Sequence, residues 1–230
     1  MILNDMQHVP GFELVRAMPY GAALFEGDDT RLTVIMANRG ALEAQFGADL
    51  IYYNETYSAF VIVQYKAMEM APNEGAIFRL PNANLSDEIT RMEGILVRLR
   101  QCSANTASGG YRLMENPFFL KLCPRLIFNP DDVALIKGMY LPLGYWRLLE
   151  TDPILVGPKG GRRITFENVR RYLDNTSFVA LMSKGWIGTT PTQSQLLENI
   201  IRVVIQSNRT LTIAVKTGLQ PEEIKDLFSA

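Results

Sequence analysis

The spacing of apolar residues predicts a helix at the start of the best-patterned part of the chain. Between residues 30 and 46 apolar side chains recur every three or four positions, the period of one helix face: Leu32, Ile35, Met36, Leu42 and Phe46. Asp28 or Asp29 can cap this helix, and Gly47 suits its C-terminal end. Glu43 lies at the edge of the apolar stripe, so we expect its carboxylate to face the rest of the fold.

Two strands are predicted next, because the pattern changes to short runs of β-branched and aromatic residues. They cover residues 48–53 and 59–67 and are joined by a polar turn at 54–56. Side chains alternate along a strand, so Gln64 and Lys66 share one face. A buried strand has no structural need for a lysine at its end, and Lys66 is therefore the first indication of a functional site.

The rest of the chain is predicted to add strands and helices in a definite order. A short strand at 77–80, an amphipathic helix at 86–102 and a strand at 118–123 come first. Helices are then expected at 131–138, 142–150, 165–173, 176–184 and 191–207, followed by a strand at 211–216 and a short helix from Pro221. We therefore expect a lead-in at 1–29, a core at 30–125 and a mainly helical region at 126–230 packed on that core.

Composition and charge narrow the classes of function. The 230 residues are 47% hydrophobic and 20% charged, which is ordinary for a chain that buries a substantial core. No apolar run reaches the roughly 20 residues of a membrane span, and the N-terminus lacks the layout of a signal peptide. We therefore expect a cytoplasmic protein with no membrane partner. Because His8 is the only histidine, a Ser-His-Asp triad or a His/Cys zinc site is disfavoured, and catalysis would rest on carboxylates, amides, lysines and a hard metal.

Three motifs in sequence carry a resemblance to a known family. They are Glu43 on the first helix, Gly47-Ala48-Asp49 entering a strand, and Gln64-Tyr65-Lys66 on the next strand. Their order resembles the PD-(D/E)xK nuclease superfamily, in particular its Mrr-like restriction endonuclease branch, where the last motif is often Gln-x-Lys. The resemblance covers roughly residues 30–125, and residues 126–230 match nothing recognisable.

The resemblance implies both a fold and an activity. The fold would be α/β, with a restriction-endonuclease-like core of helix, mixed central β-sheet and helix, and a mainly helical C-terminal region. The activity would be metal-dependent hydrolysis of phosphodiester bonds, in DNA rather than RNA, in bacterial restriction or anti-phage defence. A homodimer or a larger defence complex would be the assembly.

The resemblance also implies a role for each motif residue. Asp49, the amide oxygen of Gln64 and the backbone carbonyl of Tyr65 would hold Mg²⁺ or Mn²⁺, since these ions prefer oxygen ligands. Glu43 would be a further ligand, direct or through water. Lys66 would orient or help deprotonate the attacking water.

Two departures from the family pattern keep other hypotheses open. Ala48 stands where the family often has proline, and Gln64 stands where a carboxylate is usual, so the site has one negative charge less. A catalytically inactive nuclease-fold module that binds nucleic acid or a protein partner is therefore the second hypothesis. In a purely structural interpretation, Asp49 caps a turn and Lys66 extends its ammonium from the end of a strand.

A basic segment follows the core, although the formal net charge of the whole chain is −1. Residues 157–171 contain five basic residues against one acidic residue: Lys159, Arg162, Arg163, Arg170 and Arg171. A local patch of this kind binds phosphates even on a near-neutral protein. We assign these residues to contact with a nucleic-acid backbone, and the alternative is an exposed, flexible basic turn.

Overall fold

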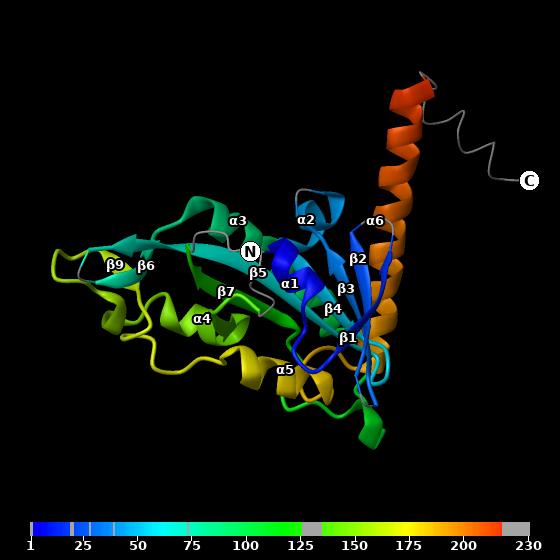
Figure 1. Ribbon diagram of the computed structural model, residues 1–230, viewed down its shortest axis with the longest axis horizontal. Coiled ribbons are helices and arrows are strands. Elements are labelled where there is room, and N and C mark those ends of the chain that lie inside the picture. The colour runs from blue at the N-terminus through cyan, green and yellow to red at the C-terminus, as the bar shows by residue number, and fades with distance from the viewer. Residues whose placement is uncertain are drawn as a thin grey trace, which may run out of the picture.

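The computed structural model describes residues 2–18, 21–27, 29–38, 40–72, 74–125 and 135–217. In these residues the chain forms an α/β protein with a mixed nine-stranded sheet, helices on its faces and a long C-terminal helix (Figure 1). The α/β class expected from the sequence is therefore confirmed.

The sheet is organised around one long central strand. The strands are β1 (Glu13–Met18), β2 (Ala22–Glu26), β3 (Arg31–Met36), β4 (Leu50–Asn54), β5 (Ala59–Ala71), β6 (Gly75–Leu80), β7 (Phe118–Pro124), β8 (Met139–Pro142) and β9 (Arg162–Ile164). The strands β1 to β6 and β9 pair in that order, and β7 joins β5 to β8. β5 pairs in parallel with β7, whereas its pairings with β4 and β6 are antiparallel.

The two neighbours of β5 on one side leave a gap between them. The β4 pairing ends at Leu50 opposite Val63, and the β6 pairing begins at Glu69 opposite Ile77. Between these points, residues 64–68 of β5 are paired with β7 on their other side. We call this gap between β4 and β6 the fork, and the backbone of β5 is open there to partners other than a strand.

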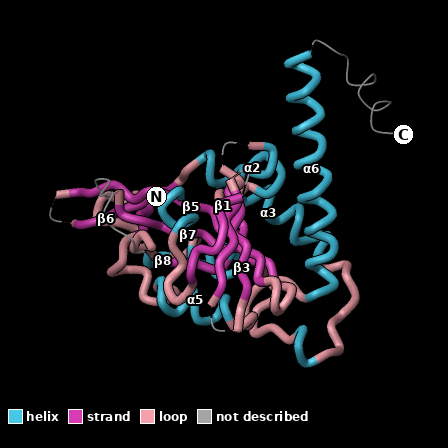
Figure 2. The backbone as a smooth tube through the Cα atoms, turned by 45° about the vertical axis from the view of Figure 1, so that its right-hand side comes forward, coloured by secondary structure: helices cyan, strands magenta, loops and turns pink. Residues whose placement is uncertain are grey.

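Helices cover both faces of the sheet, as Figure 2 shows. They are α1 (Ile2–Gln7), α2 (Ala41–Phe46), α3 (Ala83–Leu99), α4 (Leu143–Leu149), α5 (Asn175–Ser183) and α6 (Pro191–Thr217), with short 3-10 turns η1 (Ser108–Gly110) and η2 (Pro153–Leu155). Buried residues of α2, α3, α4 and α6 form one apolar core with one face of β5. Buried residues of α1 and α5 form a second core with the other face.

The helix expected over residues 30–46 is wrong in its first half. Residues 31–36 are strand β3, and the helix is only the six-residue α2. Leu32 and Val34 are fully buried in one core, whereas Ile35 packs against the other. Because both faces of β3 are partly covered, its apolar residues do not alternate strictly, and their spacing resembles that of a helix.

The other elements of the core follow the sequence expectation closely. The strands expected at 48–53, 59–67, 77–80 and 118–123 are confirmed as β4, β5, β6 and β7. The helix expected at 86–102 is α3, which begins three residues earlier than expected. It does so because the Asn82 side chain caps it by accepting the Leu85 N–H at 3.0 Å.

The C-terminal region is less helical than its spacing suggests. Helices expected at 142–150, 176–184 and 191–207 are confirmed as α4, α5 and α6, but no helix forms at 165–173. There Thr165 and Asn168 form a side-chain-bonded turn, and Leu173 pairs with Tyr140. Two further strands, β8 and β9, join the sheet in this region. The strand expected at 211–216 is wrong, because these residues continue the helix α6. Residues 135–138 are not helical; the rest of that expected helix and the helix from Pro221 lie outside the described residues.

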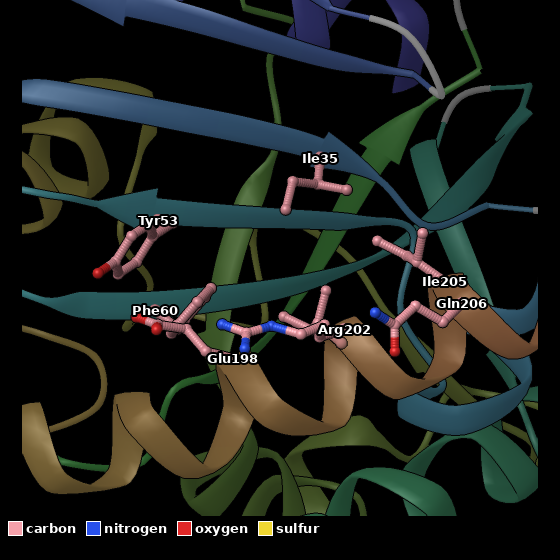
Figure 3. A pocket seen from close by; sticks show the side chains of 8 residues that line it. Ile35, Tyr53, Phe60, Glu198, Arg202, Ile205 and Gln206 are labelled. Carbon is pink, nitrogen blue, oxygen red and sulfur yellow. The ribbon is translucent and has the colours of Figure 1, made fainter. Parts of the chain in front are cut away.

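The helix α6 packs on the sheet with its first half and extends beyond it (Figure 1). A hollow of about 360 Å³ separates it from β3, β4 and β5 (Figure 3), with Tyr53 stacked on Phe60 at 4.3 Å and Glu198 and Arg202 facing from the helix. Within the part of the chain that the structure describes, none of the helices combines the length and apolarity needed to cross a membrane.

Candidate functional site at the fork of the sheet

The fork holds the motif residues because of how β4 enters the sheet. Asp49 precedes β4, and its backbone N–H still bonds to the Val63 carbonyl at 3.0 Å. At the next step the strands part, and the Asp49 side chain replaces the missing strand: its Oδ2 accepts the Tyr65 N–H at 2.8 Å. Asp49 is thereby fixed beside Gln64 and Lys66, which lie on either side of Tyr65 in β5.

Asp49 is a buried carboxylate. Its exposed fraction is 4%, and burial raises its pKa to about 6 despite the hydrogen bond from Tyr65, which lowers it. The negative charges of Glu43 and Glu88 raise the pKa further, and the positive charge of Lys66 opposes them. A cation at this position would be attracted by all three carboxylates.

Lys66 does not extend freely into solvent. Its Nζ lies 2.8 Å from Oε1 and 2.6 Å from Oε2 of Glu88 on α3, and both side chains are largely buried. Burial raises the pKa of Glu88, and the Lys66 ammonium counteracts this. The ammonium is therefore held in one place by α3 rather than sampling many rotamers.

Glu88 was not among the residues singled out from the sequence. It lies within the apolar stripe of α3, whose other buried members are Leu85, Ile89, Met92, Ile95, Leu96 and Leu99. A carboxylate on the buried face of an amphipathic helix needs a partner, because charged side chains are almost never buried unpaired. That irregularity was the signal available in the sequence.

Glu43 reaches the same neighbourhood from the other helix. It lies in the first turn of α2, is half-buried, and raises the pKa values of both Asp49 and Glu88 through its charge. The expectation that Glu43 faces the fold thus agrees with the structure, although the long helix used to derive it does not exist.

Gln64 leaves an acceptor without a donor. It is 3% exposed, its Nε2 donates to the Tyr65 carbonyl at 3.4 Å, and its Oε1 is buried with no hydrogen-bond partner among the described residues. Both carboxylate oxygens of Glu88, by contrast, lie within 2.8 Å of the Lys66 ammonium. Buried acceptors without donors are rare, because each costs about 1–3 kcal/mol.

The oxygen atoms at the fork are of the types that a hard divalent cation binds. Asp49 offers a carboxylate, Gln64 an amide oxygen and Tyr65 a carbonyl, which are the ligand types Mg²⁺ and Mn²⁺ prefer. No group of three or more His, Cys, Asp or Glu side chains in the described residues is arranged to hold a metal by itself.

The basic segment is not one continuous patch. Arg162 and Arg163 lie on β9, where alternation directs them to different sides; Arg162 donates to the Glu150 carbonyl at 2.9 Å, whereas Arg163 is paired with Glu74. Arg171 lies over the Tyr145 ring at 5.9 Å. Lys159, Arg162, Arg170 and Arg171 are exposed, and Arg163 is half-buried.

A second buried ion pair lies under the opposite face of the sheet. Lys121 on β7 and Asp5 on α1 are both fully buried, with Nζ 2.5 Å from Oδ2. Tyr65 donates its hydroxyl to the same Asp5 oxygen at 3.0 Å, and the Ile136 N–H donates to the other oxygen at 2.7 Å. Tyr65 therefore joins the two charged sites, through its backbone to Asp49 and through its side chain to Asp5.

No family model, curated protein or solved structure matches this chain.

Proposed function

We propose that this chain is a metal-dependent nuclease that hydrolyses phosphodiester bonds in DNA, with its active site at the fork. The observation that carries the proposal is the gathering of Asp49, Gln64 and Lys66 where the sheet opens, with the buried Oε1 of Gln64 lacking a donor among the described residues. A carboxylate, a neutral oxygen ligand and a fixed ammonium are the groups that hydrolysis of a phosphodiester requires.

The order of elements supports the finer fold assignment within this proposal. From α2 to β7 the chain runs helix, three strands, helix, strand, and β7 pairs in parallel with the motif strand β5. This is the order expected for a restriction-endonuclease-like core. β1, β2 and β3 extend the sheet on the β4 side, and α6 packs on α2 and beside β3, β4 and β5.

The cation would be held by Asp49, Gln64 Oε1 and the Tyr65 carbonyl, with Glu43 as a ligand directly or through water. When bound, Mg²⁺ or Mn²⁺ supplies positive charge to the phosphate oxygens and lowers the pKa of a bound water. The residues of the chain would hold the cation in place and orient the groups around it. Asp49 is oriented by the Tyr65 N–H, so its carboxylate does not need to reorganise when a ligand arrives.

Lys66 contributes a positioned donor. Glu88 engages its ammonium from one side, which leaves N–H groups free for a phosphate oxygen or for the attacking water. Because Glu88 and Lys66 are both largely buried, their attraction is weakly screened by solvent. In this proposal Glu88 is a positioning residue that acts through Lys66.

Contact with the nucleic-acid backbone is assigned to the exposed basic residues Lys159, Arg162, Arg170 and Arg171. Arg163, which the sequence groups with them, is already neutralised by Glu74 and contributes less. Replacing Arg162 and Arg171 by glutamate should weaken DNA binding and reduce the slope of its salt dependence, and Arg163→Gln should leave that slope nearly unchanged.

One observation favours the second candidate, an inactive nuclease-fold module that binds nucleic acid or protein. Glu88 neutralises Lys66, and Asp49 fulfils a structural role by capping Tyr65, so both motif residues have partners within the protein. The two candidates differ in what Asp49 binds besides Tyr65.

A Mn²⁺ titration in the presence of a short DNA duplex tests the proposal. The wild type and Asp87→Asn should bind Mn²⁺ with the same affinity, because Asp87 is exposed on α3 and has no role at the fork. Asp49→Asn should weaken Mn²⁺ binding by at least about 10-fold, as the loss of a carboxylate ligand predicts. Equal Mn²⁺ binding by Asp49→Asn and the wild type would overturn the nuclease proposal and favour the binding module.

A further inference from the structure

The backbone and the side chain of Tyr65 face two different charged sites. Backbone groups of successive residues in a strand point to alternate sides. The Ile62 N–H bonds to the Pro117 carbonyl, next to β7. The Val63 carbonyl instead accepts the Asp49 N–H, on the β4 side. The N–H and the carbonyl of Tyr65, two residues after Val63, therefore point into the fork rather than towards β7.

Side chains, rather than a strand, hold the Tyr65 peptide at the fork. Its N–H donates to Asp49 Oδ2 at 2.8 Å, and its carbonyl accepts a long hydrogen bond from Gln64 Nε2, at 3.4 Å. Side chains change rotamer far more readily than a paired strand separates. The position of this peptide therefore depends on what holds the side chain of Tyr65 itself.

The Tyr65 side chain is anchored on the opposite face of the sheet. Its ring is buried in the core formed with α1 and α5, and its hydroxyl donates to Asp5 Oδ2 at 3.0 Å. Lys121 donates to the same oxygen at 2.5 Å, and the Ile136 N–H donates to the other at 2.7 Å, so Asp5 is itself fixed. Hydrogen bonds to a charged acceptor are about twice as strong as neutral ones, which leaves the hydroxyl little freedom to move.

The buried pair of Asp5 and Lys121 is not needed for stability alone. Apolar residues of similar volume often stabilise a protein as well as a buried ion pair does, or better. Apolar residues could not, however, offer an oriented acceptor to the Tyr65 hydroxyl. The contribution specific to Asp5 is therefore the place at which it holds Tyr65.

We propose that Asp5, acting through the Tyr65 hydroxyl, is a positioning residue for the cation site at the fork. The helix α1 thereby fixes, from the opposite face of the sheet, the peptide whose N–H orients Asp49 and whose carbonyl faces the cation. This inference rests on the proposed function, because it assumes that a divalent cation binds at the fork. Metal ligands depend on outer partners of this kind, and loss of such a partner typically lowers metal affinity.

Mn²⁺ affinity in the presence of a short DNA duplex measures positioning separately from folding. Tyr65→Phe keeps the ring and removes the hydroxyl, so Asp5 stays paired with Lys121 while Tyr65 loses its anchor. Tyr52→Phe is the matched control: its buried hydroxyl lies 3.3 Å from that of Tyr65 and has no hydrogen bond to Asp5 in the described part of the chain. Each titration is made well below the melting temperature of the variant, so that lower stability alone leaves the protein folded.

A second variant breaks the same link by another route. Asp5→Leu combined with Lys121→Met replaces the buried pair with apolar side chains, an exchange that is often neutral or stabilising. The Tyr65 hydroxyl then has no carboxylate to bind, even where the melting temperature is unchanged. Weaker Mn²⁺ binding by this double variant would therefore report the position of Tyr65 rather than the stability of the fold.

Tyr65→Phe and the double variant should each weaken Mn²⁺ binding by about 3- to 10-fold, and Tyr52→Phe by less than about twofold. Adding Tyr65→Phe to the double variant should weaken binding by less than about a further twofold, because a link that is already broken cannot be lost again. Wild-type affinity in Tyr65→Phe, or equal weakening by Tyr52→Phe, would overturn the inference.

The wild type and Asp49→Asn separate this inference from the proposed function. If Asp49→Asn weakens Mn²⁺ binding and Tyr65→Phe does not, the metal site stands and the positioning role of Asp5 is wrong. If the wild type binds no Mn²⁺ with DNA present, the proposed function fails and this inference fails with it.

Discussion

Gly47 and Glu88 are in direct backbone contact: a Cβ added at Gly47 would lie 2.4 Å from the Glu88 carbonyl oxygen. Gly47 also ends α2 in the left-handed region, with φ 63°, and its N–H bonds to the Glu43 carbonyl at 2.7 Å. The close approach holds the helix that carries Glu43 against the helix that carries Glu88. The spacing of the carboxylates around the fork therefore depends on a glycine with no side chain of its own.

Gly47→Ala should damage both stability and the site. The left-handed φ and the collision with Glu88 together should lower the free energy of unfolding by about 2–4 kcal/mol. Because α3 must shift to relieve the collision, the Lys66–Glu88 contact should loosen and cleavage should fall. Urea unfolding and a cleavage assay measure the two effects.

Gly94→Ala is the matched control for that variant. Gly94 lies inside α3, and a Cβ there would meet nothing within 4 Å, so the substitution should be neutral or stabilise the helix by up to about 1 kcal/mol. Equal behaviour of the two alanine variants would show that the Gly47–Glu88 contact is unimportant.

The sequence predicted the strands of the core better than the helices around it. β4, β5 and β7 contain strongly apolar runs of β-branched and aromatic residues, a composition that favours a strand over a helix. β3 was misread because burial on both faces removes the alternation that identifies a strand. The end of α6 is predicted as a strand because the larger apolar residues Leu211, Ile213 and Val215 recur at every second position, a local pattern that the continuing helix overrides.

The sequence predicts only those residues of the candidate site that lie close together along the chain. Asp49, Gln64 and Lys66 lie within 18 consecutive residues, and a strand hairpin brings them together whatever the rest of the fold does. Glu88 and Lys121 depend on packing between distant segments, and spacing along the chain does not encode which carboxylate meets which lysine. The pairing of Lys66 with Glu88 and of Lys121 with Asp5 required the tertiary structure.

Asp49→Asn should stabilise the metal-free protein at neutral to alkaline pH. The pKa of Asp49 is raised from 3.8 to about 6, so between these values the folded state holds a proton that the unfolded state has lost. Stability from this group is therefore fully present below about pH 4 and falls as pH rises towards 6, by roughly 3 kcal/mol. The variant should be about 1–3 kcal/mol more stable than the wild type at pH 8 and nearly equal at pH 4, as measured by urea unfolding.

The same titration predicts the pH dependence of metal binding. A cation requires ionised Asp49, so Mn²⁺ affinity of the wild type should rise between pH 5 and 7 and level off above that range. A flat affinity across this range would exclude Asp49 as a ligand.

Glu88→Gln tests whether the Glu88 carboxylate positions the Lys66 ammonium for cleavage. The variant keeps the shape of the side chain but removes the charge that holds Lys66, so cleavage should fall by about 10- to 100-fold, mainly in kcat, with DNA affinity little changed. Asp87→Asn, one residue earlier on the exposed side of α3, should cleave like the wild type. If Glu88→Gln instead altered only KM, the role of Glu88 in fixing the ammonium would be wrong.

Lys121→Met should be among the most destabilising single substitutions. It leaves Asp5 as a buried charge without its cation, which typically costs about 3–5 kcal/mol. Adding Asp5→Asn should recover part of that loss, whereas Lys184→Met on the exposed surface should change stability by less than about 0.5 kcal/mol. A loss below about 1 kcal/mol for Lys121→Met in urea unfolding would contradict the buried pair.

Cleavage of plasmid and linear DNA with Mg²⁺ or Mn²⁺ decides whether the fork is an active site, with the wild type compared with Lys66→Ala and with the milder Lys66→Met. We expect metal-dependent cleavage by the wild type and a loss of about 100-fold or more in both variants, with their folded state verified by thermal melting. Cleavage that survives unchanged in folded Lys66→Met would place any active site elsewhere than the fork. No cleavage by the wild type in either metal would contradict the enzyme proposal and leave the binding module.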